Sequence, residues 1–273
     1  MKTFIRSGKG IAQFFFAVIF MPSCNLIEYH PYDLHNKNQP SDLNQTNISL
    51  IEKLNDDTDT IRFVFMGDTQ RHYDETVDFV RDVNKRDDID FIIHGGDVTD
   101  FGMSKEFSWI YDIMNKLRVP YVTLIGNHDI VGHGKEVFKK IYGDFNFSFN
   151  FRKIRFICLN TNALEFDYAT PVPDFDFMTR FLSDTASVQS TVVVMHAPPF
   201  DDQFNNNSGL MFNYILERYK NLQFCLHAHR HSLSVTDYFS NGILYYGCDD
   251  MAGRNYLVFT IVGNSYSYQV VYF

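Results

Sequence analysis

The chain has 273 residues and a formal net charge of −9 at pH 7, and 45% of its residues are apolar, including 28 Phe and 16 Tyr. This apolar content is enough to fill the core of one large globular domain. Binding along a nucleic-acid backbone requires clustered Lys and Arg, whereas the 24 in this acidic chain are scattered. We therefore expect no nucleic-acid partner.

The first residues are typical of an export signal. Three basic residues precede an apolar segment, residues 11–21, which is shorter than the ~20 residues that a membrane-spanning helix needs. The following PSCN, with Cys24, resembles the lipobox of bacterial lipoproteins in the relaxed Ser-Cys form of Bacteroidetes-type members. This pattern predicts a signal peptide over 1–23, a lipidated Cys24 that attaches the protein to the membrane, and a polar tether over 24–60. The expected location is the bacterial cell envelope, on the periplasmic or outer-membrane surface; an ordinary cleaved signal with an incidental cysteine is the alternative.

Three cysteines remain beyond the tether, at positions 158, 225 and 248. Their number is odd, and two of them lie inside apolar runs of β type. No CxxC spacing occurs that would favour a cysteine metal site. We therefore predict reduced core cysteines rather than a disulfide framework.

From residue 62 onward, runs of strand type alternate with runs of helical type. In chain order these are a strand over 63–66, a helix over 73–85, a strand over 91–94, a helix over 105–117 and a strand over 121–125. Such alternation predicts parallel βαβ units.

Beyond Lys139 the apolar runs become shorter and closer together. Strands are expected within 145–151, 153–160, 191–196, 221–227, 242–246, 256–262 and 266–272, and helices near 175–182 and 209–220. Together with the first half, this pattern predicts an α/β fold in which two β-sheets pack face to face with helices outside.

Five of the expected strands end in polar residues of metal-ligand type: FVFMGDTQ, FIIHGGDVTD, YVTLIGNHD, TVVVMHAPP and FCLHAHRH. Sites in open α/β sheets form at the carboxyl ends of strands, so these endings should meet at one edge. Residues two apart on a strand point the same way, which pairs Asp68 with Gln70 and His227 with His229. His231 shares that parity but follows Arg230, where we expect the strand to turn, and it is predicted to be an exposed histidine.

The order GD-x-Q, GGD, GNHD, H-x-PP and H-x-H resembles the calcineurin-like metallophosphoesterase superfamily over residues 62–273. The resemblance implies a four-layer α/β/β/α sandwich with two mixed β-sheets and flanking helices, in a catalytic domain over 61–273.

The resemblance also implies two divalent metal ions, each held by four side chains. Asp68, Gln70, Asp97 and His229 would surround the first ion, and Asp97, Asn127, His196 and His227 the second, with Asp97 as the bridge. His128 would assist the leaving group and Asp129 would orient its ring, while His94 and Asp100 would be structural or outer residues. Mixed His, carboxylate and amide ligands suit Mn, Fe or Zn better than Ca.

The implied activity is hydrolysis of a small phosphorylated substrate, a phosphomonoester or phosphodiester, with a hydroxide between the two ions as the nucleophile. The alternative is a surface binding module on the same fold with a structural or degraded metal site. One position departs from the usual pattern, since Gln70 stands where many members have His. Its amide oxygen can ligate, and His72, two residues on, is the competing candidate.

Overall fold

The structure of the protein, a computed structural model, describes residues 30–31, 40–54, 59–167, 170–183, 186 and 188–273. The signal peptide predicted over 1–23 and Cys24 lie outside the described residues. Residues 31–273 form one compact unit. Within the described part of the chain, no helix combines the length and the apolar character needed to cross a bilayer.

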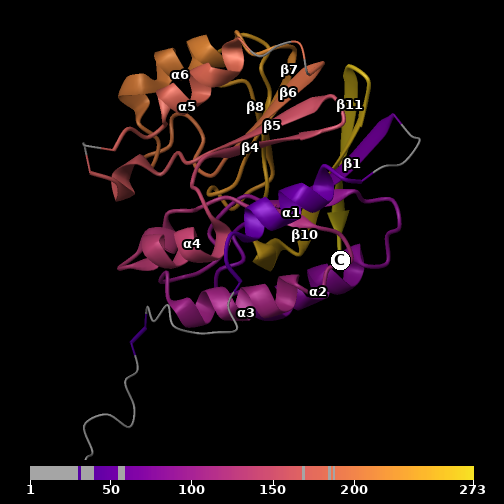
Figure 1. The fold of residues 1–273 in the computed structure, drawn as a ribbon, viewed down its shortest axis with the longest axis vertical. Helices are drawn as coiled ribbons and strands as arrows, with labels where there is room; N and C mark the ends of the chain where they lie inside the picture. Colours follow the sequence, from indigo (N-terminus) through magenta and orange to yellow (C-terminus); the bar gives the residue numbers. More distant parts are fainter. Residues whose placement is uncertain (1–29, 32–39, 55–58, 168–169, 184–185, 187) are drawn as a thin grey trace, which may run out of the picture. The chain divides into compact units, whose positions relative to one another are not determined.

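One sheet has five strands in the order β11-β10-β1-β2-β3 (Figure 1). Strands β1, β2 and β3 are parallel, β10 pairs antiparallel with β1, and β11 pairs antiparallel with β10. Their bounds are β1 Thr60–Met66, β2 Phe91–His94, β3 Tyr121–Thr123, β10 Asn255–Val262 and β11 Ser265–Tyr272. Strands β2 and β3 are buried along their whole length, as expected of apolar parallel strands covered on both faces.

The other sheet has six strands in the order β4-β5-β6-β7-β9-β8. Strands β5, β6, β7 and β9 are parallel, and β4 and β8 pair antiparallel at the two edges. Their bounds are β4 Phe147–Phe151, β5 Ile154–Leu159, β6 Ser190–Met195, β7 Leu222–His227, β8 Ser234–Thr236 and β9 Tyr245–Gly247.

An aromatic core fills the space between the two sheets. Phe63 stacks on Phe91 with ring centroids 5.3 Å apart, and Phe259 stacks on Phe224 of the opposite sheet at 4.7 Å. Such pairs add roughly 0.5–1.5 kcal/mol each beyond the burial of their area. This core fixes the two sheets against each other, so the strand ends on both sides are held at one edge.

Helices cover the outer face of each sheet, which completes the four predicted layers (Figure 1). The five-stranded sheet is covered by α2 (Tyr73–Val83), α3 (Ser104–Met114) and α4 (Gly134–Tyr142), and the six-stranded sheet by α5 (Phe175–Thr179) and α6 (Gly209–Leu216). Short 3₁₀ turns are η1 (His128–Ile130), η2 (Ala163–Glu165), η3 (Arg180–Leu182), η4 (Asn206–Ser208) and η5 (Met251–Gly253). The predicted α/β/β/α sandwich is confirmed.

Part of the predicted tether is folded. Helix α1 (Leu43–Ile51) lies against β3 and buries Ile48 and Ile51 in the core. Asn44 donates to the carbonyl of Thr123 and accepts from its N–H, both at 2.8 Å, and Asn47 donates to the carbonyl of Tyr121 at 2.7 Å. The tether predicted over 24–60 is therefore wrong for this segment, because the two amides give the helix a specific place on the sheet edge.

The three cysteines of the domain, at positions 158, 225 and 248, are buried and free. Burial raises the pKa of each thiol above its ordinary value. The prediction of reduced core cysteines is confirmed.

Candidate metal centre

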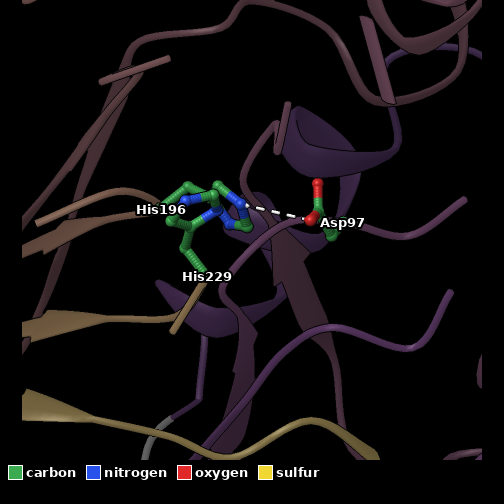
Figure 2. Close-up of side chains that lie close together, drawn as sticks. All are labelled: Asp97, His196 and His229. Carbon is green, nitrogen blue, oxygen red and sulfur yellow. Dashed lines mark ion pairs between the residues drawn. The ribbon is translucent and has the colours of Figure 1, made fainter. Parts of the chain in front are cut away.

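Strands of both sheets end at one site. Segments that follow β1, β2, β3, β6 and β7 bring together seven side chains of metal-ligand type: Asp68, Gln70, Asp97, Asn127, His196, His229 and His231. Two groups have ligand atoms within 4.8 Å of one another, one made of Asp97, His196 and His229 and the other of Asp68, Asp97 and His231. Figure 2 shows the two rings of the first group beside the Asp97 carboxylate. Because Asp97 belongs to both groups, it has the position of a bridge.

The backbone around this site is held in unusual conformations. Asp68, Asp97, His229 and His231 all have positive φ, between 46° and 70°. Each such residue costs on the order of 1–3 kcal/mol and persists where the surroundings determine it, often at functional sites. Gly126 allows one close approach, since a Cβ there would lie 2.1 Å from Oδ1 of Asp97.

The first group of donors converges around Nε2 of His196. This atom lies 3.1 Å from Oδ1 of Asn127. It also lies 3.4 Å from Oδ2 of Asp97, the contact dashed in Figure 2. The ring of His229 lies beside that of His196, with centroids 5.0 Å apart, and its buried Nδ1 has no hydrogen-bond partner. Four donors from four segments therefore face one another.

The second group contains further buried atoms without partners. Oδ1 of Asp68 lies 3.4 Å from Nε2 of His231 and accepts no hydrogen bond, and Oε1 of Gln70, which is only 4% exposed, has no hydrogen-bond partner either. The backbone N–H of Gln70 donates to the carbonyl of Asp97 at 3.1 Å, which fixes this residue beside the bridge. Buried polar atoms left unpaired are costly, and cations at these positions would satisfy them.

The second nitrogen of each of the three histidines faces an oxygen atom. Nδ1 of His196 donates to the carbonyl of Gly95 at 2.9 Å. Nε2 of His229 lies 3.0 Å from Oδ1 of Asp201, and Nδ1 of His231 lies 3.4 Å from Oδ2 of Asp250. Such outer partners fix the tautomer and the ring orientation of metal-binding histidines. The residue types and their partners thus fit a metal centre.

In this structure histidines are the partners of the two buried carboxylates, Asp68 and Asp97. Burial raises the pKa of Asp68, while burial of Asp97 is outweighed by His196 and its pKa is lowered. Burial also acts to lower the pKa of His196, but the charge of Asp97 prevails and raises it to about 9. The ion-pair partners of the two buried carboxylates in the described part of the chain are histidines alone. Divalent ions would replace those protons.

His227, which the sequence pattern placed among the ligands, is not in either group. It is the last residue of β7, its Nδ1 bonds the carbonyl of Ala228 at 2.9 Å, and its ring lies 6.2 Å from that of Tyr238. Burial lowers its pKa to about 4. The expected pairing by strand parity fails because the strand ends there and the chain turns at His229. His231 is exposed, as predicted, yet it still reaches Asp68.

His72 also stays outside both groups. It precedes α2, and its Nε2 lies 3.8 Å from Oδ2 of Asp250, the carboxylate that faces His231. Gln70 is the residue that lies buried beside Asp97.

His128 lies at the rim of the site, with a side chain 36% exposed. Its backbone N–H donates to Oδ1 of Asp97 at 2.9 Å, and its Nδ1 donates to the carbonyl of Asp100 at 3.0 Å. Nε2 is then the nitrogen that a substrate can reach. The exposed Arg71 pairs with the Asp100 carboxylate.

Asp129 does not hold the His128 ring, contrary to the prediction. It is fully buried, and its carboxylate accepts hydrogen bonds at 2.8–3.2 Å from the backbone of Val98, Thr99 and Gly126 and from the Thr99 hydroxyl. Burial raises its pKa to about 7, although the hydrogen bonds from the backbone act to lower it. Its contacts tie the loop after β2 to the loop after β3.

The structural role predicted for His94 fits its contacts. Its Nε2 lies 2.9 Å from the hydroxyl of Thr69, and burial lowers the pKa of His94 to about 3.

A signal for His231 exists in the sequence. A glycine stands directly before Asp68, Asp97 and Asn127, and Ala228 is the small residue directly before His229. A Cβ at Gly67 or Gly95 would lie 2.9 or 2.8 Å from the Cβ of Ala228, so small residues meet where these loops cross. If the small residue is taken to mark the position just before the first ligand, the ligands in HAHRH are His229 and His231. Strand parity instead selects His227 and His229.

Known proteins with this fold include a phosphatase and a protein described as an anchor. A purple acid phosphatase, PPD1 of yellow lupin (Lupinus luteus) seeds, has 13% identity and a TM-score of 0.60, covering 77% of this chain and 51% of that chain. GAP50, described as the anchor in the inner membrane complex of Plasmodium, has 12% identity and a TM-score of 0.58, covering 78% of this chain and 84% of that chain. At such identities the likeness shows the fold alone.

The sequence comparisons are more specific. An uncharacterized protein of Bacillus subtilis (strain 168), YvnB, is 30% identical over an alignment of 107 residues that covers 34% of this chain and 8% of that much longer protein. Residues 61–233 match the calcineurin-like phosphoesterase family, and this segment contains every residue of the two groups. The chain therefore belongs to the calcineurin-like phosphoesterase family.

Proposed function

We propose that the protein is a dinuclear metal-dependent hydrolase of phosphoester bonds. The observation that carries this proposal is that two groups of donor side chains share one buried carboxylate, Asp97, and that several donor atoms are left without hydrogen-bond partners. A protein that used the fold only as a scaffold would have no need for these unsatisfied atoms.

We assign the ligands by the two groups. One ion would take Asp68, Gln70, Asp97 and His231, and the other Asp97, Asn127, His196 and His229. Compared with the sequence prediction, His231 enters in place of His227, and His229 moves from the first ion to the second. The mixture of imidazole, carboxylate and amide donors suits Mn, Fe or Zn.

When bound, two divalent ions would neutralise the phosphoryl oxygens and lower the pKa of a water so that it can attack phosphorus at neutral pH. The side chains of the protein would orient the metal ligands and protonate the leaving group. The carbonyl of Asp100 keeps the proton of His128 on Nδ1 in the neutral ring, so the protonated ring carries its second proton on Nε2. As the P–O bond to the alcohol breaks, that proton passes to the departing oxygen. Asp201 and Asp250 keep the rings of His229 and His231 in place.

The test is an assay of purified protein, loaded with Mn, with a chromogenic phosphomonoester and a chromogenic phosphodiester. Turnover should depend on the metal and be abolished in Asp97→Ala, because the bridge contacts both groups and its removal leaves two cations to repel each other. Asp88→Ala, a carboxylate on the surface away from the site, is the matched control and should keep full activity. Metal binding without turnover of either substrate would favour the binding-module alternative.

We also propose that the protein is attached to a bacterial membrane through a lipid on Cys24. The support is the sequence alone: a short apolar segment followed by PSCN. Cys24→Ser should release the mature protein into the soluble fraction or block its processing. Normal processing with unchanged membrane retention would refute lipidation.

A further inference from the structure

A pocket opens directly beside the candidate metal centre. It has a volume of about 640 Å³, and His229 of the first donor group is part of its wall. The segment after β6, residues 198–208, supplies Phe200, Asp201 and Asp202 to the wall, and Leu164 and Arg230 are also part of it. Because His229 belongs both to this wall and to the Asp97 group, the pocket adjoins the place where a phosphoryl group would bind.

Phe200 presents an aromatic ring to this pocket in a conformation that is costly to maintain. Its side chain is 60% exposed, and its φ of 66° is rare for a bulky residue. The amide of Asn206 holds the turn on both sides, accepting from the N–H of Phe200 and donating to the carbonyl of Asp201, both at 2.8 Å. The ring rests on Phe239, with centroids 5.3 Å apart. The aromatic surface is therefore fixed before any ligand arrives.

The charges of the pocket restrict what it can bind. Asp201 and Asp202 are two carboxylates on its wall, and the guanidinium of Arg230 is engaged by Oδ2 of Asp201 at 3.2 Å and by the hydroxyl of Tyr238 at 3.0 Å. These carboxylates disfavour a second phosphate, because Arg230 is already paired with Asp201. Phe200 and Leu164 instead offer exposed apolar surface to an uncharged group.

We propose that this pocket binds the alcohol part of the phosphoester and that this part is an uncharged planar ring, with Phe200 as its stacking surface. The inference rests on the proposed function for the position of the phosphoryl group. Leu164, 67% exposed, adds a second apolar contact, and the exposed Asp202 offers an acceptor for N–H groups at the edge of such a ring. The substrate class is thus an ester of a heteroaromatic or aryl-bearing alcohol.

Equilibrium binding of adenosine 5′-phosphate and of ribose 5-phosphate to the Mn-loaded protein tests this, because the two ligands share a ribose phosphorylated at the same hydroxyl and differ in whether its anomeric carbon carries adenine or a hydroxyl. His128→Ala serves as the background, so that neither ligand is consumed. We expect the ligand with the ring to bind about 5- to 100-fold more tightly, the range that base–aromatic stacking supplies.

Phe200→Gly should abolish this difference while leaving the binding of ribose 5-phosphate unchanged. Glycine accepts the positive φ, so the turn and the position of Asp201 are preserved, and an unchanged metal content verifies this. Phe200→Tyr should keep the difference, and Leu210→Ala, an exposed apolar residue of α6 outside the pocket wall, should have no effect.

The pocket assignment is overturned if Phe200→Gly retains the preference, or if phosphocholine binds more tightly than both ligands. The proposed function is judged separately, by turnover in the protein with His128 intact. If the protein prefers the ligand with the ring but shows no turnover, the pocket assignment stands and the hydrolase proposal is refuted. If it shows turnover but no such preference, the hydrolase proposal stands and the pocket assignment is refuted.

Discussion

His231 and Asp68 meet with Nε2 and Oδ1 3.4 Å apart, although they come from segments on different sheets. The contact places the third histidine of HAHRH, rather than the first, at the buried carboxylate. It divides the histidines of this segment into two that face the site and one that ends a strand.

The first prediction separates these roles by metal content. His231→Ala should lower bound Mn to about one ion per chain, because it removes the single imidazole of the Asp68 group. His227→Leu should keep both ions, since His227 belongs to neither donor group. Elemental analysis after gel filtration measures both variants. Loss of metal in His227→Leu with retention in His231→Ala would restore the assignment made from strand parity.

The second prediction concerns Asp250, whose Oδ2 lies 3.4 Å from Nδ1 of His231. Asp250→Ala should weaken binding of one ion by about 10- to 100-fold, because the His231 ring loses the acceptor that orients it. Titration of the metal-free protein with Mn gives the affinity, and the ¹⁵N shifts of His231 report which ring nitrogen carries the proton. Asp249→Ala is the matched neighbour, since Oδ2 of Asp249 accepts from Asn255. Equal losses in both variants would mean that the loop, not the Asp250 carboxylate, matters.

The third prediction separates chemistry from metal binding. His128→Ala should retain both ions and lower turnover by roughly 10²- to 10⁴-fold, as expected for a lost general acid. The loss should be largest for esters with poor leaving groups, because these depend most on a proton. A series of aryl esters of increasing phenol pKa provides the measurement. If the variant lacks an ion, His128 is a ligand and the role given to it is wrong.

The fourth prediction concerns the amide that replaces the usual histidine. The ion beside Gln70 should be the weaker of the two, since its ligands include one imidazole and its neighbour's include two. Mild chelation should then remove one ion first. Gln70→Ala should lower occupancy at this ion further, whereas His72→Ala, 3.8 Å from Asp250 and outside both donor groups, should not. Gln70→His should tighten it. Two ions retained in Gln70→Ala, with one in His72→Ala, would exclude Gln70 as a ligand.

Much of the fold was predictable because buried faces of strands and helices require apolar residues at regular spacings in the sequence. The strand expected over 91–94 has those bounds in the structure, and the helix expected over 73–85 ends two residues earlier. Helices α1 and α4 were not predicted, since α1 lies in a polar segment whose asparagines acquire meaning only beside β3. The pattern of residues within one segment does not reveal contacts with a strand that is distant in sequence.

The candidate site was likewise predictable in part. The donors directly after strands, such as Asp68 and Asp97, follow from the rule that sites form at the carboxyl ends of strands. His231 could not be placed by strand parity, because the chain enters the left-handed region at His229 and again at His231. The role of Asp129 could not be placed either, since its four donors come from two separate loops.

The amides of Asn44 and Asn47 have a consequence for how this chain avoids self-association. They occupy backbone groups of β3, which is an outer strand of its sheet. An uncovered outer strand offers a template for intermolecular pairing. A recombinant domain that begins at residue 61 would lack helix α1 and would leave this edge and the apolar side chains beneath the helix uncovered. Helix α1 therefore covers the open edge of the sheet, and we expect a recombinant domain that includes it to aggregate less than one that begins at residue 61.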